Sequence, residues 1–116
     1  MAGDTVMRTM LFDFYGDLLT DKQREYYDLH YNNDLSLYEI AEQTGVSRQA
    51  VWDIIRRADA ILTQTEEKTG FVAKALRRRQ ELEKISAELS ELAGITQGRA
   101  REKVLDIAER LQSLGD

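Results

Sequence analysis

The fold is decided by the stretch LYEIAEQTGVSRQAVWDIIR, residues 37–56, which has the spacing of a helix-turn-helix. Ala41 is small at the point where the two helices of such a motif cross, and Gly45 allows the sharp turn between them. Ser47 is a good N-cap for the second helix. Because these requirements are met together, the stretch predicts this motif. The wedge between its helices is filled by apolar side chains, which are Ile40, Val46, Val51 and Ile54.

The second helix of the motif carries the candidate nucleic-acid-binding residues, because in DNA-binding proteins the start of this helix meets the groove. Residues 47–70 contain four bases and four acids, whereas strong DNA binders neutralise about six to ten phosphates. Three interpretations therefore stay open for this helix: contact with DNA, contact with RNA or protein, and an ordinary core helix with a solvated outer face. The candidate residues are Ser47, Arg48, Gln49, Trp52, Arg56 and Arg57.

Trp52 lies one position off the apolar stripe of the same helix. It could pack against the C-terminal helices or serve as a hot spot for a partner. The stripe predicts a helix that runs to residue 68 or 69, where Gly70 ends it. Its members are Val51, Ile54, Ile55, Ala58, Ile61 and Leu62.

The residues before the motif also carry helix signals. Thr20-Asp-Lys-Gln23 and Ser36-Leu-Tyr-Glu39 are capping boxes, which open a second and a third helix. Gly45 is expected to end the third helix in the left-handed conformation. A first helix is predicted over residues 5–19, with an apolar face made of Leu11, Phe12, Tyr15, Leu18 and Leu19.

The last third of the chain repeats apolar positions at alternating spacings of four and three, as in a coiled-coil seam. The simplest structure is an antiparallel helical hairpin, joined by Gly94-Ile-Thr-Gln-Gly98 with Thr96 as an N-cap. Because a hairpin alone buries little, we expect it to pack on the N-terminal domain or on a second copy, and we predict a homodimer. The two seams are Phe71, Ala75, Arg78, Leu82, Ile85, Leu89 and Leu92, and Ala100, Val104, Ile107, Leu111 and Leu114.

These patterns predict an all-α protein with a helix-turn-helix domain, residues 1–69, followed by a helical hairpin, residues 70–116. The 116 residues include no proline and no cysteine, which excludes a disulfide scaffold and any thiolate metal site or nucleophile. His30 is the only histidine, so no imidazole pair exists for a metal. We therefore expect a protein that is not an enzyme and that needs no metal or cofactor.

The charge of the chain is uneven. Residues 1–46 carry nine acids and three bases, net −6, whereas residues 71–116 carry nine bases and eight acids, net +1. A basic strip on the first arm of the hairpin could face RNA phosphates or an acidic partner. Alternatively its bases are solvated, and Arg78 pairs with a glutamate such as Glu102 or Glu109. The strip consists of Lys74, Arg77, Arg79 and Lys84.

The N-terminal third combines aromatic and acidic residues. Its aromatic side chains are expected to pack in the core, because the carboxylates among them would repel the phosphates of stacked bases. The pairs Asp13/Asp17 and Glu39/Glu42 lack a third metal ligand and are expected to be solvated. Acids also interrupt the apolar patch at Met10–Phe12, so no signal peptide or membrane insertion is expected. We expect the protein to be cytoplasmic. The aromatic residues are Phe12, Phe14, Tyr15, Tyr26, Tyr27, Tyr31 and Tyr38.

Four segments of residues 6–70 resemble the YlxM family of small bacterial proteins: LFDFYG at 11–16, LTDKQR at 19–24, DLSLYEIAE at 34–42 and VSRQAV at 46–51. The central part is also similar to region 4 of sigma-70 factors. The YlxM resemblance implies an auxiliary, non-catalytic and regulatory role with the signal recognition particle, through its GTPase subunit, its RNA or both. The alternative is a DNA-binding transcription regulator, although the acidic N-terminal half and Asp53 depart from the sigma pattern.

Overall fold

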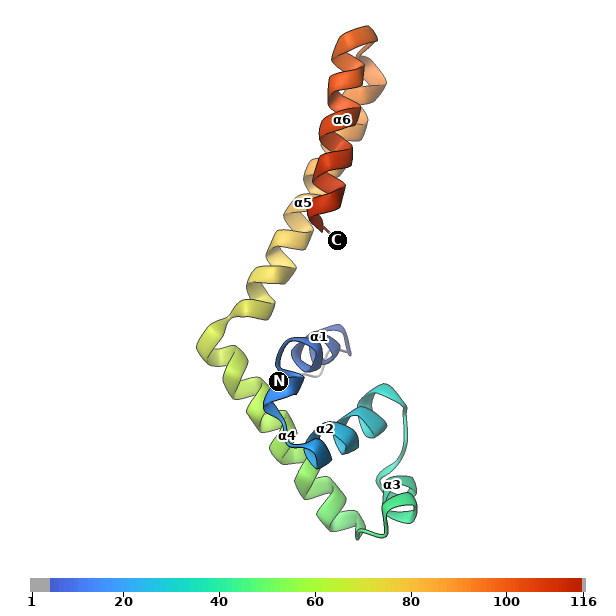
Figure 1. The fold of residues 1–116 in the computed structure, drawn as a ribbon, viewed down its shortest axis with the longest axis vertical. Coiled ribbons are helices and arrows are strands. Elements are labelled where there is room, and N and C mark those ends of the chain that lie inside the picture. Colours follow the sequence, from blue (N-terminus) through green and yellow to red (C-terminus); the bar gives the residue numbers. More distant parts are fainter. Residues whose placement is uncertain (1–4, 116) are drawn as a thin grey trace. The chain divides into compact units, whose positions relative to one another are not determined.

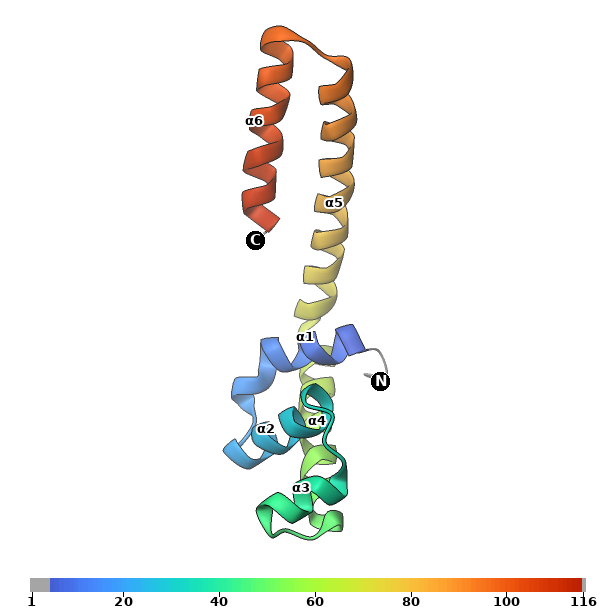
Figure 2. The same cartoon turned by 90° about the vertical axis from the view of Figure 1, so that its right-hand side faces the viewer.

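The computed structural model describes residues 5–115, and helices make up almost all of them (Figures 1 and 2). No strand occurs in this part of the chain, so the predicted all-α class is confirmed. The chain divides into two compact units, one up to Val72 and the other from Ala73 onward. The elements are α1 (Thr5–Tyr15), the 3₁₀ turn η1 (Gly16–Leu18), α2 (Asp21–Tyr27), the π-helical turn η2 (Asp28–Asn32), α3 (Leu37–Thr44), α4 (Arg48–Thr69), α5 (Phe71–Ile95) and α6 (Gly98–Gly115).

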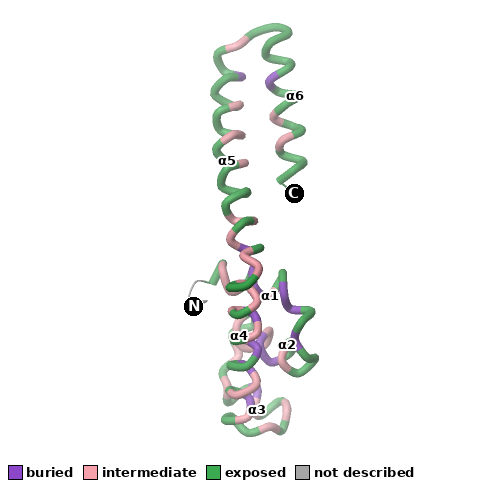
Figure 3. Tube along the Cα trace, turned by 90° about the vertical axis from the view of Figure 1, so that its left-hand side faces the viewer, coloured by how far each residue is buried: buried purple, intermediate pink, exposed green. Residues whose placement is uncertain are grey.

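The N-terminal unit is built around α4, which α1, α2 and α3 all contact (Figure 1). The apolar stripe of α4 forms the centre of the core, as its spacing predicts. Figure 3 shows the buried residues concentrated in this unit, with few in the hairpin. The fully buried side chains of the stripe are Val51, Ile55, Ala58 and Leu62.

The helix ends of this unit follow the signals in the sequence. In the box at Thr20, the hydroxyl accepts the Gln23 N–H at 3.2 Å and the Gln23 side chain accepts the Thr20 N–H at 2.9 Å. The box at Ser36 has the same pair of bonds with Glu39. Gly45 ends α3 in the left-handed conformation, with φ of 76°. These predicted caps are confirmed.

The prediction of a continuous first helix over residues 5–19 was wrong. Helix α1 ends at Tyr15, and the chain continues as the tighter 3₁₀ turn η1. The change of pitch turns Leu18 to the solvent, where 61% of it is exposed, while Leu19 stays buried. An ion pair between Arg24 and Asp17, at 2.6 Å, bridges this turn to α2.

The aromatic residues of the N-terminal third form a stack that is mostly internal. The rings of Phe12 and Tyr27 are stacked at 5.5 Å, and Tyr31 lies 4.7 Å from Tyr27. The Arg8 guanidinium sits 4.2 Å from the centre of the Tyr31 ring. Core packing is therefore confirmed for this stack. The prediction of core packing was wrong for two other aromatic residues, Phe14 and Tyr38, which are exposed.

Tyr27 is the most confined of these side chains, because it is fully buried and its hydroxyl has no hydrogen-bond partner among the described residues. Burial raises the pKa of Tyr27, and the Asp59 carboxylate raises it further, while the Arg8 cation opposes the shift. The folded protein thus holds the neutral phenol more strongly than the unfolded chain, whose pKa is the ordinary 10.0. This contribution to stability is complete below about pH 10 and is lost as the pH rises above that value.

We therefore expect the free energy of unfolding to fall as the pH rises from about 9 to about 11.5, and to fall less steeply in Tyr27→Phe. Urea denaturation across this range measures the slope. Tyr27→Phe should cost nothing at neutral pH, since the hydroxyl it removes is unpaired. The matched control is Tyr38→Phe at a 58% exposed position, which should keep the slope of the parent. Equal slopes in all three proteins would contradict the assignment to Tyr27.

A polar network closes the end of α4. The Tyr15 hydroxyl donates to Glu66 Oε1 at 2.6 Å and lies 2.5 Å from Thr69 Oγ1. Because its one proton goes to the carboxylate, the Thr69 hydroxyl donates to Tyr15. The Val72 N–H also donates to Glu66 Oε1, at 3.0 Å. The network ties α1 to the last turn of α4 and the first turn of α5, across Gly70 in the left-handed conformation.

The C-terminal unit is an antiparallel hairpin of α5 and α6 (Figure 2). Ala93 and Val104 are its buried residues in the described part of the chain. The predicted connection was too long, because α5 continues through Gly94 to Ile95. Thr96 is also not an N-cap: its hydroxyl donates back to the Leu92 carbonyl at 2.8 Å. None of the described helices combines the length and apolarity needed to cross a bilayer.

Candidate functional site

An open groove lies between the start of α3 and the start of α4. Its volume is about 740 Å³. Tyr38 from α3 and Trp52 from α4 are partly exposed, at 58% and 38%, and present aromatic surface from two helices. The groove is therefore a feature of the helix-turn-helix itself. Its lining residues are Ser36, Leu37, Tyr38, Ser47, Arg48, Gln49 and Trp52.

A second hollow adjoins the groove on the side of the turn, and the two share Tyr38, Ser47 and Arg48. Glu42 contributes a carboxylate to this second hollow. Its remaining lining residues come from the end of α3 and from the turn. Arg48 thus borders both hollows, whose lining residues include Ser36 at the start of α3 and Gly45 in the turn.

The structure brings four of the six predicted helix-turn-helix residues together, namely Ser47, Arg48, Gln49 and Trp52. It does not bring the other two into the groove. Arg56 pairs with Asp53 at 3.4 Å. Arg57 is exposed and stands five residues from Trp52, about 140° further around an ideal helix.

The groove carries little charge. Among the described lining residues Arg48 is the only base, and no ion pair holds its guanidinium within residues 5–115. The Gln49 amide reaches the Asp53 carboxylate only at 3.4 Å, and the Ser47 hydroxyl accepts the Ala50 N–H. An unpaired guanidinium, an amide and two aromatic faces can bind base edges, stacked bases or a peptide.

Sequence reasoning missed the contribution of α3 to this groove, since Tyr38 was placed with the core aromatics. A signal was present in the helix period. Tyr38 precedes the fully buried Ile40 by two residues, which puts it about 200° away on the helix, facing solvent. The capping box at Ser36 fixes where α3 begins and hence where Tyr38 points.

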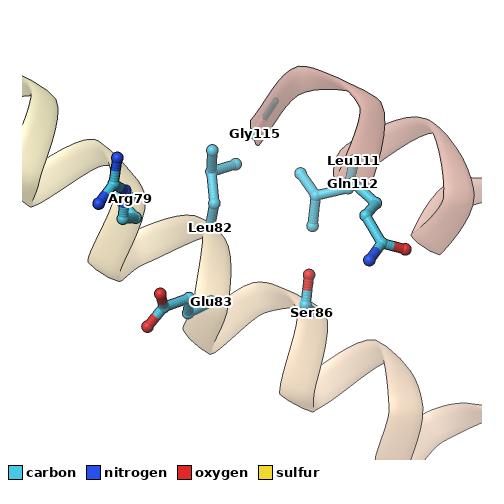
Figure 4. A pocket seen from close by; sticks show the side chains of 7 residues that line it. All are labelled: Arg79, Leu82, Glu83, Ser86, Leu111, Gln112 and Gly115. Atoms are coloured by element: carbon cyan, nitrogen blue, oxygen red, sulfur yellow. The ribbon is translucent and has the colours of Figure 1, made fainter.

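The predicted basic strip does not form one surface. Arg77 and Arg79 are two residues apart, so an α-helix directs them to nearly opposite sides. Lys74 and Lys84 lie on the side of Arg77, at spacings of three and seven residues. Arg79 instead borders a hollow with a volume of about 440 Å³, and Figure 4 shows its side chain on α5 beside that hollow. That hollow lies between α5 and α6 and is lined by Arg79, Leu82, Glu83, Ser86, Leu111, Gln112 and Gly115.

Arg78 does not have the predicted glutamate partner. Its side chain is exposed, and the ion pairs within residues 5–115 do not include it. The prediction of a pair with Glu102 or Glu109 was therefore wrong. Because Arg78 stays in water, it has no buried charge to neutralise.

No group of three histidine, cysteine or carboxylate side chains in the described part of the chain could hold a metal ion. Two of the four acidic residues considered earlier have other partners. Asp17 pairs with Arg24, and Glu39 accepts the Ser36 N–H in a capping box. His30 is partly buried, and its Nδ1 lies 2.8 Å from the Leu35 carbonyl oxygen.

A family model described as "Putative helix-turn-helix protein, YlxM / p13 like", UPF0122, matches residues 3–101. A UPF0122 protein of Geobacillus kaustophilus is 51% identical over 94 residues, which cover 81% of this chain and 86% of that protein. One from Caldanaerobacter subterraneus is 48% identical over 85 residues, 73% of each chain. One from Halalkalibacterium halodurans is 40% identical over 114 residues, 98% of this chain and 99% of that protein.

Proposed function

The chain belongs to the UPF0122 family of YlxM/p13-like helix-turn-helix proteins, and from this premise we propose that it is a non-catalytic accessory protein of the bacterial signal recognition particle. It acts in the cytoplasm and binds the particle's GTPase subunit, its RNA or both. The YlxM resemblance supplies the particle as the partner. The groove carries the binding part of the proposal, because it is lined by the partly exposed Tyr38 and Trp52 and by Arg48, which forms no ion pair within residues 5–115.

The charge distribution favours a protein or a short unpaired segment of RNA over a long nucleic-acid duplex. Residues 1–46 carry a net charge of −6, from nine acids and three bases, and would repel a duplex that spans the domain. An unpaired RNA base could instead stack on an aromatic side chain and receive hydrogen bonds from an amide or a guanidinium. The groove supplies these groups on Tyr38, Trp52, Gln49 and Arg48.

The second candidate is a DNA-binding regulator. The observation in its favour is the position of Ser47, Arg48 and Gln49, which lie at the start of α4, where recognition helices meet base edges. Such a regulator reads two half-sites as a dimer, and its affinity falls steeply with salt. We further propose that the protein is a homodimer, to which the C-terminal helices contribute. This state is compatible with either candidate.

The test is capture of the purified GTPase subunit and of the particle RNA, measured separately with the full-length protein. Arg48→Ala combined with Gln49→Ala should weaken capture at least about tenfold, because a few central residues carry most of the binding energy of an interface. A DNA duplex library serves as the competitor. Preferential recovery of a DNA sequence, without capture of either particle component, would favour the second candidate instead.

The exposed face of α5 is tested in the same assay. Arg77→Glu with Lys84→Glu changes two bases on one side of the helix, and Arg79→Glu is the matched control on the other side. If the first side meets RNA phosphates, the double variant should flatten the salt dependence by about one unit for each contact removed. Arg79→Glu should leave it unchanged. An effect of Arg79→Glu about half as large as that of the double variant would mean that only net charge matters, because the single variant changes the net charge by half as much.

A further inference from the structure

The groove between α3 and α4 offers hydrogen-bond donors from both helices. At its α3 side the Ser36 hydroxyl accepts the Glu39 N–H at 3.0 Å, and at its α4 side the Ser47 hydroxyl accepts the Ala50 N–H at 3.1 Å. Because each hydroxyl acts as the acceptor in its cap, its own proton remains to be donated. The Trp52 indole adds an N–H donor to the same lining. These groups suit a ligand that brings carbonyl or carboxylate oxygens.

Arg48 adds a requirement for one anionic group. It is the charged side chain among the described residues that line the groove, and it forms no ion pair within residues 5–115. A guanidinium binds a carboxylate or a phosphate through two parallel hydrogen bonds. Tyr38 and Trp52 line the same groove, so an anion bound to Arg48 would hold its neighbouring groups near aromatic surface. The ligand therefore combines one anion with an apolar group.

The surroundings of the groove are acidic. Glu42 lines the adjoining hollow. Glu39 accepts the N–H of one lining residue, Ser36, at 2.9 Å, and Asp53 lies 3.4 Å from the side-chain amide of another. One base stands with these three acids, which is Arg56 in its ion pair with Asp53. Arg48 thus provides a single site for negative charge within a neighbourhood that repels more of it.

This distribution of charge distinguishes a protein ligand from RNA. An RNA strand that placed one base in the groove would carry a phosphate on each side of that nucleotide, close to the acids that adjoin the groove. Proteins that bind single strands instead use a positively charged groove that follows the backbone. A peptide backbone is neutral, and its carbonyl oxygens can accept from the Ser36 and Ser47 hydroxyls. Charge complementarity therefore favours a peptide segment.

We propose that the groove binds a segment of a partner protein in which an aspartate or glutamate stands next to an aromatic or large aliphatic residue, with neutral or basic residues on either side. The carboxylate pairs with Arg48, and the apolar side chain packs on Tyr38 and Trp52. Basic neighbours meet the acids that adjoin the groove. This inference rests on the binding role proposed for the groove above, and it narrows the ligand from protein or RNA to protein.

Selection from a library of random peptides displayed on phage tests the proposal with the full-length protein. The parent should enrich peptides that carry a carboxylate beside an apolar residue. Arg48→Glu should enrich a lysine or arginine in place of that carboxylate, because reversing one charge reverses the preference for the other. The matched control is Arg57→Glu, which changes the net charge equally at an exposed position outside the groove and should select as the parent does.

Two results of the selection would overturn the proposal. One is the recovery of the same peptides by the parent and by Arg48→Glu, since the guanidinium would then have no part in the choice. The other is the absence of any enriched peptide with the parent. The selection contains no component of the signal recognition particle. Enriched acidic peptides without capture of the particle would therefore contradict the proposed function and leave this inference standing.

The fluorescence of Trp52 reports whether a selected peptide occupies the groove, because this is the only tryptophan of the chain. Titration with the most enriched peptide should change the emission, and replacing its acidic residue by the corresponding amide should weaken binding about tenfold. An unchanged emission would place the peptide elsewhere and overturn the proposal. A pool of short random single-stranded RNAs is titrated in parallel. If RNA changes the emission of the parent but not of Arg48→Glu, and the peptide changes neither, the ligand is RNA and the proposal is wrong.

Discussion

Replacing Leu62 by alanine is expected to lower the free energy of unfolding of the N-terminal unit by about 2–5 kcal/mol. Leu62 is fully buried on α4, the helix that α1, α2 and α3 contact. Truncation removes apolar surface from the core and leaves a cavity that the surrounding helices fill only in part. Urea denaturation followed by circular dichroism measures the loss.

The matched control is Leu18→Ala, the same truncation at a position where 61% of the side chain is exposed. It should change the free energy of unfolding by less than about 0.5 kcal/mol. The two variants also distinguish the structure from the sequence-based prediction, which placed Leu18 on the buried face of a longer first helix. A cost at Leu18 comparable with that at Leu62 would contradict the 3₁₀ turn at Gly16–Leu18.

The second large effect is expected at the turn of the helix-turn-helix. Gly45 has φ of 76°, and a Cβ added there would meet no atom within 4 Å. The cost of Gly45→Val therefore comes from the backbone alone, because a β-branched residue resists positive φ. We expect a loss of about 1–3 kcal/mol. The melting temperature of the full-length protein and its urea midpoint both report it.

Gly45→Asn is the control, since asparagine adopts the left-handed conformation more readily than other residues. It should retain most of the stability that Gly45→Val loses. The same two variants also test the groove, because Gly45 lies in the turn between α3, which carries Tyr38, and α4, which carries Trp52. Gly45→Asn should keep partner capture close to that of the parent. Equal stability of the valine and asparagine variants would refute the backbone explanation.

Local signals in the sequence predicted the helix ends well. Each capping box or terminal glycine acts through residues three or four positions away, so its effect can be worked out without knowing the fold. This is why Thr20, Ser36, Gly45, Ser47 and Gly70 cap or end helices as expected. The buried face of α4 was predicted equally well from its apolar stripe, because a surface helix buries one face against its neighbours.

The candidate site could be predicted only in part from the sequence. Grouping bases by closeness in the sequence joined Arg77 with Arg79, although the helix period separates them. Arg56 pairs with Asp53 three residues earlier, and its contact with nucleic acid stays a prediction. The groove also needed Tyr38, which contributes from a different helix. These differences arise because a surface is shared between elements, while each pattern describes one element.

The sequence by itself determined that the chain is all-α, that residues 37–56 form a helix-turn-helix, and that a hairpin follows it. Spacing and capping act over one or two helical turns, so these features can be predicted without knowing any long-range contact. Only the tertiary structure decided which side chains are shared between helices. It placed Tyr38 beside Arg48 and Trp52, turned Leu18 outward, and left Ile107 and Leu114 uncovered. The physical reason is that burial depends on what lies opposite a residue, and a helical repeat does not contain that information.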